Sequence, residues 1–353
     1  MNNSNVSQTK NTHFDFVDLL KGFGIFLVVW GHTMTPRSIY IYSFHMPLFF
    51  FLSGFVHKDK PFRQFVLSKI NALYIPYLTF SALSWMFYLV QMLLDRRLES
   101  VSTHLPKLQS LLTGSADNGG NNPIWFLTCI LVVSIIFLVL DRYLKHPAVQ
   151  CGVILGLSLI GYRLSLARFD LLFQSDIALS GLVFYWLGYS IKKCNFLQHL
   201  NDVKRRKLVW VIVACEIIHI ATAYLNTRLA EIQRVNMAGN LLGNYFLFYI
   251  SALTGIAVFL IIGYKLQYIH VFNHLGMNTL IILATHKPLL QVFNNLLDGY
   301  VNTDTRLYGF LSSILAIALS LLLGIYLNKK FPYIIGKKPF YQLFHKTTPP
   351  ISH

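Results

Sequence analysis

Three histidines lie within or beside long apolar runs and are the strongest candidates for chemistry in this sequence. His32 and His45 flank a short polar break in FLVVWGHTMTPRSIYIYSFHMPLFFFLSGF (residues 26–55), and His286 lies beside Lys287 in LGMNTLIILATHKPLL. A neutral imidazole with a pKa of about 6.5 can accept a proton from an alcohol, and a second ring can orient the first. We therefore name His32, His45 and His286 as candidate catalytic residues.

Each histidine also has a structural interpretation. His32 and His45 could simply lie at the outer membrane interface, and Met46 and Pro47 fit a helix start, because proline is tolerated in the first turn. His286 is harder to explain by packing, since it and the neighbouring lysine would lie near the middle of an apolar segment, where ionisable groups are costly.

Asp18, Lys21 and His32 share one face of the helix predicted for the first apolar run. At about 100° per residue the three side chains fall within roughly 60° of one another, and His32 lies about 21 Å above Asp18. This pattern predicts a polar path across the first span. The alternative is an i,i+3 pair of Asp18 and Lys21 in the headgroup zone, unrelated to His32.

The remaining polar residues point to no other established chemistry. Glu216 and His219 are three residues apart and are interpreted as satisfying each other. The four cysteines are scattered without CxxC spacing, so neither a disulfide framework nor a metal site follows, and we expect no metal. GxSxG, HExxH, Walker and GxGxxG motifs are lacking, which leaves hydrolases, metalloproteases and nucleotide motors without support.

The composition indicates which elements must position these residues. Of the 353 residues, 54% are hydrophobic and only 12% are charged, and apolar runs of roughly 18 to 22 residues recur along the chain. We therefore predict an all-α integral membrane protein, a polytopic bundle of about ten transmembrane helices. The predicted spans are 15–34, 39–57, 73–94, 123–140, 148–162, 171–191, 208–225, 244–263, 276–297 and 307–327.

The basic residues predict the topology of these spans. The first residues lack the features of a cleavable signal peptide, so we expect the first span to be retained. Of the 30 lysines and arginines, 20 lie in or next to segments on one side, which places both termini in the cytoplasm. Because these charges lie in short loops, the formal charge of +16 does not indicate nucleic-acid binding.

This topology divides the chain into a cytoplasmic N-terminal segment (1–14), a transmembrane domain (15–327) and a basic cytoplasmic tail (328–353). The outer loops 95–122 and 226–243 are either ordered over a cavity or flexible connections.

A series of segments resembles the membrane acyltransferase family 3, in particular its fucose-O-acetylase-like branch of polysaccharide O-acetyltransferases. The segments, in the order found in that family, are DLLKGFGIFLVVWGH, FHMPLFFFLSGF, KINALYIPY, IWFL, DIALSGLVFYWLGYSIKK and LGMNTLIILATHKPLL. The resemblance implies a bacterial cytoplasmic-membrane enzyme that moves an acetyl group from cytoplasmic acetyl-CoA to a hydroxyl of an extracytoplasmic glycan or lipid-linked sugar. Its partners would be these two substrates and the lipid bilayer, with no nucleic acid.

The resemblance also assigns roles to residues. The catalytic histidine of the family maps onto His32, and its basic residue at the start of the first span maps onto Lys21. We place Lys21, Lys69, Asp18 and Arg63 on the donor side as candidate coenzyme A-binding residues. The sequence departs from the family before IPY, where relatives often carry arginine and this chain has Asn71 and Ala72; Lys192, Lys193 and the basic cluster at 204–207 could compensate.

Two mechanisms and one other class of protein stay open at this point. His32 could remove the proton of the acceptor hydroxyl, or it could carry the acyl group covalently. The alternative class is a transporter that uses buried His, Lys and Asp residues as a proton or substrate relay. A structural scaffold would leave the buried ionisable groups unexplained.

Overall fold

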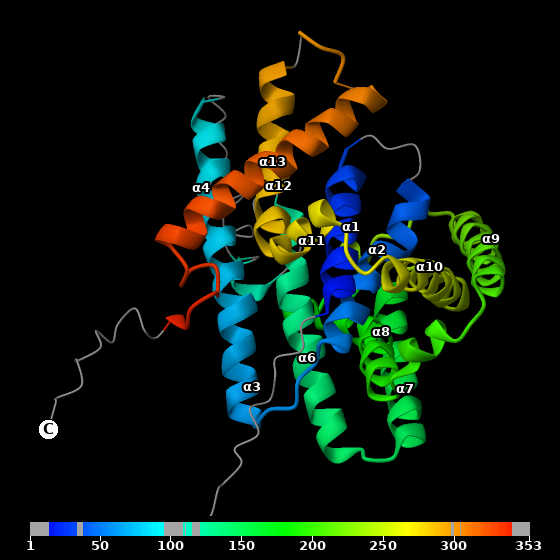
Figure 1. Cartoon of the computed structure of the whole chain (residues 1–353). Coiled ribbons are helices and arrows are strands. Elements are labelled where there is room, and N and C mark those ends of the chain that lie inside the picture. The colour runs from blue at the N-terminus through cyan, green and yellow to red at the C-terminus, as the bar shows by residue number, and fades with distance from the viewer. Residues whose placement is uncertain are drawn as a thin grey trace, which may run out of the picture.

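A computed structural model describes residues 14–33, 38–94, 109, 111–114, 121–297, 300–303 and 305–340, and within these ranges the fold is all-helical, without a β-strand. The predicted fold class is therefore supported. The long helices, labelled in Figure 1, are α1 (Asp15–Gly31), α2 (Ser38–Phe55), α4 (Ile75–Leu94), α6 (Trp125–Tyr143), α7 (Pro147–Ala167), α8 (Ser175–Lys193), α9 (Arg205–Leu229), α10 (Tyr245–Leu266), α12 (Thr279–Leu297) and α13 (Arg306–Lys330), with the shorter α3 (Phe62–Lys69) and α11 (His270–Met277).

Seven of the described helical stretches are long and apolar enough to cross a membrane. They are Ser38–Phe55, Phe62–Leu93, Asn122–Tyr143, Pro147–Ala167, Arg205–Leu229, Tyr245–Leu266 and Arg306–Lys330. The other three predicted spans correspond to α1, α8 and α12, which are shorter or more polar helices. The structure thus supports a multi-pass membrane protein, and the number of about ten crossings stays a prediction.

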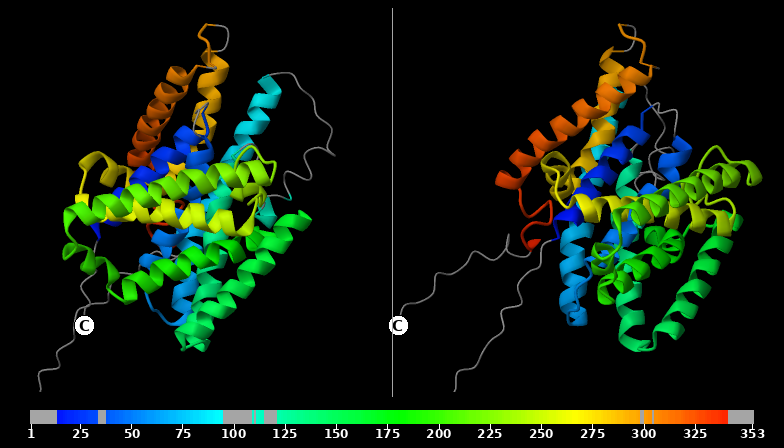
Figure 2. Two further views of the ribbon diagram at one scale, coloured as in Figure 1. Left: turned by 90° about the vertical axis from the view of Figure 1, so that its right-hand side faces the viewer. Right: turned by 45° about the vertical axis from the view of Figure 1, so that its right-hand side comes forward.

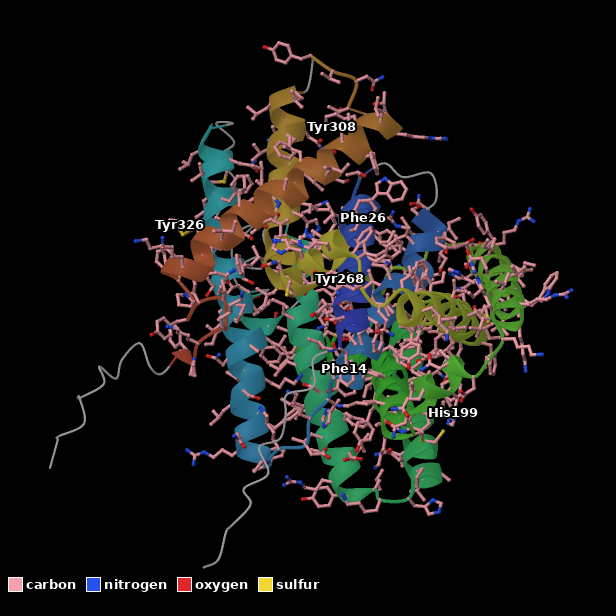
Figure 3. All side chains as sticks on the ribbon, viewed as in Figure 1. Phe14, Phe26, His199, Tyr268, Tyr308 and Tyr326 are labelled. Atoms are coloured by element: carbon pink, nitrogen blue, oxygen red, sulfur yellow. The ribbon has the colours of Figure 1, made fainter. Side chains whose placement is uncertain are left out.

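Helices α1 and α2 form the centre around which the other helices pack. Figure 2 shows α9 and α10 side by side, at a steep angle to α12 and α13, so the helices do not form one parallel bundle. In Figure 3, Phe14 and Phe26 lie toward opposite ends of α1, and His199 and Tyr308 lie toward opposite ends of the molecule. The chain reverses between α1 and α2, so the start of one helix lies at the same end as the finish of the other.

Glycines allow the central helices to approach their neighbours closely. A Cβ on Gly54 of α2 would lie 1.9 Å from the Tyr185 carbonyl oxygen of α8, and a Cβ on Gly276 of α11 would lie 1.9 Å from the Asp18 carbonyl oxygen of α1. Neither backbone could move aside without separating two helices. The expectation that the SGF segment permits close helix packing is confirmed at Gly54, as small residues do in membrane helix interfaces.

Three sequence-based expectations need correction. Pro47 does not begin a helix, because α2 starts at Ser38 and holds Pro47 in its interior. The predicted short fifth span is the 21-residue α7. The third span begins earlier than predicted, since α3 continues into α4 through a wide helical turn at Ile70–Tyr74. The error at Pro47 arose because the preference of proline for a first turn is a rule from soluble helices. Inside a membrane helix a proline is also tolerated where neighbouring groups satisfy the carbonyl that it frees.

The outer connection 226–243 is ordered. The Asn226 side chain accepts a hydrogen bond from the Asn244 backbone N–H at 2.7 Å and donates one to the Leu242 carbonyl at 2.9 Å. Buried Asp176, at the start of α8, accepts a hydrogen bond at 2.8 Å from the side chain of Asn240 in this connection. Most of the other outer loop, 95–122, lies outside the described residues.

Candidate functional site

The structure brings two of the predicted catalytic histidines together, although they are far apart in the sequence. Helix α1 ends at Gly31, His32 caps it, and the Thr33 hydroxyl donates to the Trp30 carbonyl at 2.8 Å. The half-buried His32 ring lies beside the His286 ring of α12, with the ring centroids 5.3 Å apart and the planes tilted by 42°. Helix α12 therefore carries His286 to the point where α1 ends.

His286 has a defined proton arrangement. It is fully buried, and its Nδ1 lies 2.8 Å from the Ile282 carbonyl oxygen one turn earlier. Because a carbonyl can only accept a hydrogen bond, Nδ1 carries the hydrogen and Nε2 of the neutral ring has a free lone pair. Nε2 is buried and has no hydrogen-bond partner. A buried nitrogen of this kind is costly unless a ligand or a second group meets it.

His45 has the same local arrangement in α2. It is buried, and its Nδ1 donates to the Ile41 carbonyl at 2.7 Å, which again leaves Nε2 as the acceptor. In both helices a proline follows the histidine by two residues. Within the described ranges, no three His, Cys, Asp or Glu side chains are arranged to hold a metal ion.

The carbonyl freed by the second proline has a partner. Pro288 has no N–H, so the carbonyl of Ala284, four residues earlier, lacks its helical donor. The side chain of Asn121 supplies a replacement, donating to Ala284 at 2.8 Å and to the Ser84 hydroxyl at 2.9 Å. Asn121, which opens the segment before α6, thus ties α12 to α4 beside His286.

Two cations lie near this pair of histidines. The ionisable side chains that act most strongly on the His32 ring are those of His286, Lys287, His45 and Arg234, and none of them is acidic. Arg234 comes from the ordered connection between α9 and α10. The site at this end of α1 is therefore basic as well as rich in imidazole.

A second candidate site lies at the other end of α1 and α2. It is a cavity of about 1100 Å³, and residues from four distant segments line it, including Phe14, Lys58, Lys192 and Tyr264. These segments surround the start of α1 and the ends of α2, α8 and α10, and all four fall in or beside stretches predicted to face the cytoplasm. Four lysines line the cavity: Lys58, Lys60, Lys192 and Lys193.

His57 is a buried histidine in the wall of this cavity. Its Nδ1 lies 2.8 Å from the Tyr185 hydroxyl, and its carbonyl accepts a hydrogen bond from Lys192 Nζ at 2.9 Å. Burial, followed by the nearby charge of Lys69, lowers the pKa of His57 to about 4. Burial and the neighbouring charge of Lys58 likewise lower the pKa of Lys192. Asp15 and Asp59 also line the cavity, so its four lysines leave a net positive charge that would favour a bound anion.

The predicted donor-side residues differ in their relation to this cavity. Lys21 and Asp18 form the predicted i,i+3 ion pair, with Nζ and Oδ1 3.4 Å apart, and their role on the donor side stays a prediction. Lys69 lies within electrostatic reach of Lys21, Lys60 and His57 and so adjoins the cavity without lining it. Arg63 is exposed on α3 and is not among the lining residues.

Two other sequence features have structural roles. The Asn71 side chain donates to the Gly336 carbonyl at 3.0 Å and accepts from the Phe340 N–H at 2.8 Å, so it ties the C-terminal segment to the turn before α4. Glu216 Oε2 and His219 Nδ1 lie 3.5 Å apart without a hydrogen bond, so the two side chains are neighbours but do not fully satisfy each other as predicted. The His219 Nε2 instead meets the Ser43 hydroxyl at 2.7 Å.

Sequence reasoning did not single out His57 or Arg234. His57 lies two residues after the SGF segment, in FVHKDK, and the available signal was an imidazole next to lysines at the end of a predicted span. Arg234 is one of the ten lysines and arginines outside the segments predicted to face the cytoplasm, and its departure from the charge bias was the available signal.

Comparison with known proteins gives one match. Residues 14–325 match the sequence profile of the acyltransferase 3 family, described as an acyltransferase domain. The match covers both candidate sites and most of the chain. No curated protein and no solved structure matches the chain.

Proposed function

The chain belongs to the acyltransferase 3 family, and we propose that it is a membrane O-acetyltransferase of bacterial surface glycans. In this proposal it moves an acetyl group from cytoplasmic acetyl-CoA to a hydroxyl of an extracytoplasmic glycan or lipid-linked sugar. The family match favours this class of function over the transporter that the sequence alone left open.

The observation that carries the proposal is the pair of His32 and His286 at the end of α1. His286 Nε2 is fixed as an acceptor by the bond of its Nδ1 to Ile282. It can therefore accept a hydrogen bond from one nitrogen of His32, which leaves the other nitrogen of His32 as a proton acceptor. This is the arrangement of a general base with an orienting partner, and His286 acts as a positioning residue in it.

The reaction follows from this arrangement. His32 takes the proton of the acceptor hydroxyl while the oxygen attacks the thioester carbonyl of acetyl-CoA. The C–S bond then breaks, and the leaving thiolate takes the proton from the protonated His32. Negative charge develops on the carbonyl oxygen before the C–S bond breaks.

The lysine-lined cavity supports the donor half of the proposal. The phosphates of coenzyme A would lie among Lys58, Lys60, Lys192 and Lys193, with Lys69 and Lys21 close by. The thioester arm would then extend along α1 toward His32. The cavity is framed by segments that the charge bias places in the cytoplasm, where acetyl-CoA is found.

The test compares glycan O-acetylation in host cells that lack the native chain and carry wild type, His32→Ala or the control His274→Ala, an exposed histidine on α11. At equal membrane abundance we expect His32→Ala to lose acetylation by about 100-fold or more, and His274→Ala to retain it. Undiminished acetylation in His32→Ala would exclude His32 as the general base. Absence of acetylation with wild type would exclude the glycan O-acetyltransferase.

The donor is tested separately on the solubilised protein. Acetyl-CoA is expected to raise the thermal unfolding midpoint of wild type and of His32→Ala alike, because ligand binding to the folded state stabilises it. The double variant Lys58→Gln, Lys192→Gln is expected to lose this protection. Equal protection of this double variant would place the donor elsewhere.

A further inference from the structure

We propose that the site at the end of α1 selects an anionic acceptor, in which a carboxylate or phosphate close to the reacting hydroxyl binds Arg234 and Lys287. This inference rests on the proposed acyl transfer and specifies the class of its acceptor. It assigns a role in substrate choice to two cations that are not needed to remove the hydroxyl proton.

Arg234 is held in place at the site by an aromatic ring. Its guanidinium carbon lies 3.9 Å from the centroid of the Tyr42 ring, and the Tyr42 hydroxyl donates to the Gly31 carbonyl at 3.1 Å. Gly31 directly precedes His32. A guanidinium stacked on a ring still has its N–H groups free in its own plane, so the stacking orients Arg234 without using its donors.

The backbone that carries Arg234 is also fixed. Asn226 holds the far end of the connection through its bonds to Leu242 and Asn244, and Asn240 is anchored to Asp176 of α8. The guanidinium is thus held between α2 and the ordered 226–243 connection. An arginine prearranged in this way loses less side-chain freedom when it binds a ligand.

Lys287 is the second cation. It is half-buried, follows His286 directly, and lies within electrostatic reach of Arg234. Within the described part of the chain, neither Lys287 nor Arg234 forms an ion pair with a carboxylate. Two half-buried cations within electrostatic reach of one another repel, and a bound anion would relieve this repulsion.

The proposed site of proton transfer lies at the same place, because the His286 ring lies beside that of His32 at the end of α1. Both cations act on the His32 ring. An anionic group bound by them would therefore lie close to the hydroxyl from which His32 removes a proton.

The predicted position of Arg234 on the extracytoplasmic side favours the acceptor, and not the donor, as the source of this anion. The phosphates of acetyl-CoA have the lysine-lined cavity at the opposite end of α1 and α2. Arg234 lies in a connection predicted to be extracytoplasmic, where the glycan arrives. Two sources remain for the negative charge: a carboxylate of an acidic sugar, or a phosphate of the glycan or its lipid carrier.

The experiment uses full-length protein in lipid nanodiscs, acetyl-CoA, and glycan isolated from host cells that lack this chain. One portion of the glycan is left untreated, one has its carboxyl groups reduced to alcohols, and one has its phosphates removed. Acetyl transfer is measured for wild type, Arg234→Gln, Lys287→Gln and the control Arg228→Gln, an exposed arginine at the end of α9. Thermal protection by acetyl-CoA shows that each variant is folded.

We expect one of the two treatments to raise the acceptor KM of wild type by about tenfold or more, the treatment identifying the source of the charge. Arg234→Gln and Lys287→Gln are expected to raise KM for untreated glycan by a similar factor and to leave KM for the neutralised glycan unchanged. Arg228→Gln is expected to behave as wild type.

Three results would overturn the inference. One is equal KM values of wild type for all three glycans. Another is a fall in kcat of the two variants with an unchanged KM, which would assign the cations to the oxyanion alone. The third is an equal loss with charged and neutralised glycan. Failure of the proposed function is distinct from these results, because no glycan would then be acetylated by wild type.

Discussion

At the level of single residues, His57 and His286 are both buried imidazoles, but their surroundings differ. His286 lies beside another histidine at the proposed site of transfer, whereas His57 lies in the wall of the lysine-lined cavity, against Tyr185. The groups that act on His57 are Lys69, Asp59, Asp141 and Lys192, of which Lys69 is the strongest. Its neutral form is therefore part of the folded state.

This state of His57 predicts an acid-dependent loss of stability. Its pKa of about 4 is below that of an unfolded histidine, so between about pH 6.5 and pH 4 the folded protein binds fewer protons than the unfolded chain. The free energy of unfolding should then fall as the pH falls through this window, by roughly 3 kcal/mol in total. Thermal unfolding midpoints of solubilised protein from pH 7 to pH 4.5 measure this change.

The matched variants are His57→Asn, which retains a donor near the Tyr185 hydroxyl, and His146→Asn at an exposed histidine. We expect the first to reduce the acid dependence by the share that His57 contributes and the second to leave it as in wild type. An unchanged slope in His57→Asn would assign the acid sensitivity to other groups.

At the level of elements, α2 and α12 share a short pattern, a histidine followed two residues later by a proline inside the helix. The ring Nδ1 binds a carbonyl of the preceding turn in both helices. In α12 the carbonyl freed by Pro288 is satisfied by Asn121. The pattern therefore both fixes the imidazole and creates an acceptor that a neighbouring segment can use.

The link between Asn121 and Pro288 can be tested with a double-mutant cycle. Asn121→Ala is expected to cost roughly 1–3 kcal/mol of unfolding free energy, because it leaves the buried Ala284 carbonyl without a donor. Pro288→Ala restores the helical N–H, so in the Asn121→Ala background it should recover much of this loss. Unfolding midpoints in detergent for wild type, both single variants and the double variant provide the comparison. Additive effects would contradict the proposed exchange of donors.

The sequence predicted most elements but fewer of their internal features. The ranges of apolar residues predict helices well, since a membrane leaves few other ways to satisfy the backbone. Pro47 was misplaced because the preference of proline for a first turn is a local rule, whereas its tolerance inside α2 depends on the surroundings. Helix α11 was not predicted, because most of His270–Met277 fell in the connection before the ninth span at 276–297, and only the packing of Gly276 on α1 reveals it.

At the level of the whole molecule, the proposed donor and acceptor sites lie at opposite ends of α1 and α2. The histidine of the family pattern, His32, could be named from sequence, and so could His286 as a buried ionisable residue. That α12 brings His286 to His32 could not be predicted, because it depends on contacts between distant helices. For the same reason residue spacing could not predict the cavity, which is formed by segments near Phe14, Lys58, Lys192 and Tyr264.

The opposite placement of the two sites predicts a difference in labelling. Cys194 is exposed and directly follows the cavity-lining Lys193, so a membrane-impermeant maleimide should react with it in inside-out vesicles but not in intact spheroplasts. Gln233→Cys, next to Arg234 and introduced with Cys194→Ser, should react in spheroplasts instead. Labelling of both positions from the same side would contradict the predicted topology and the proposed route of transfer.

The length of α1 has a consequence for inhibitor design. Its 17 residues span about 25 Å, and the lysine-lined cavity and His32 lie at its two ends. A compound that joins a coenzyme A-like head to a mimic of the acceptor would therefore need a linker of about this reach to engage both ends at once. Compounds with shorter linkers should bind no better than their stronger half, so a series of increasing linker length would show a sharp gain in affinity at one length.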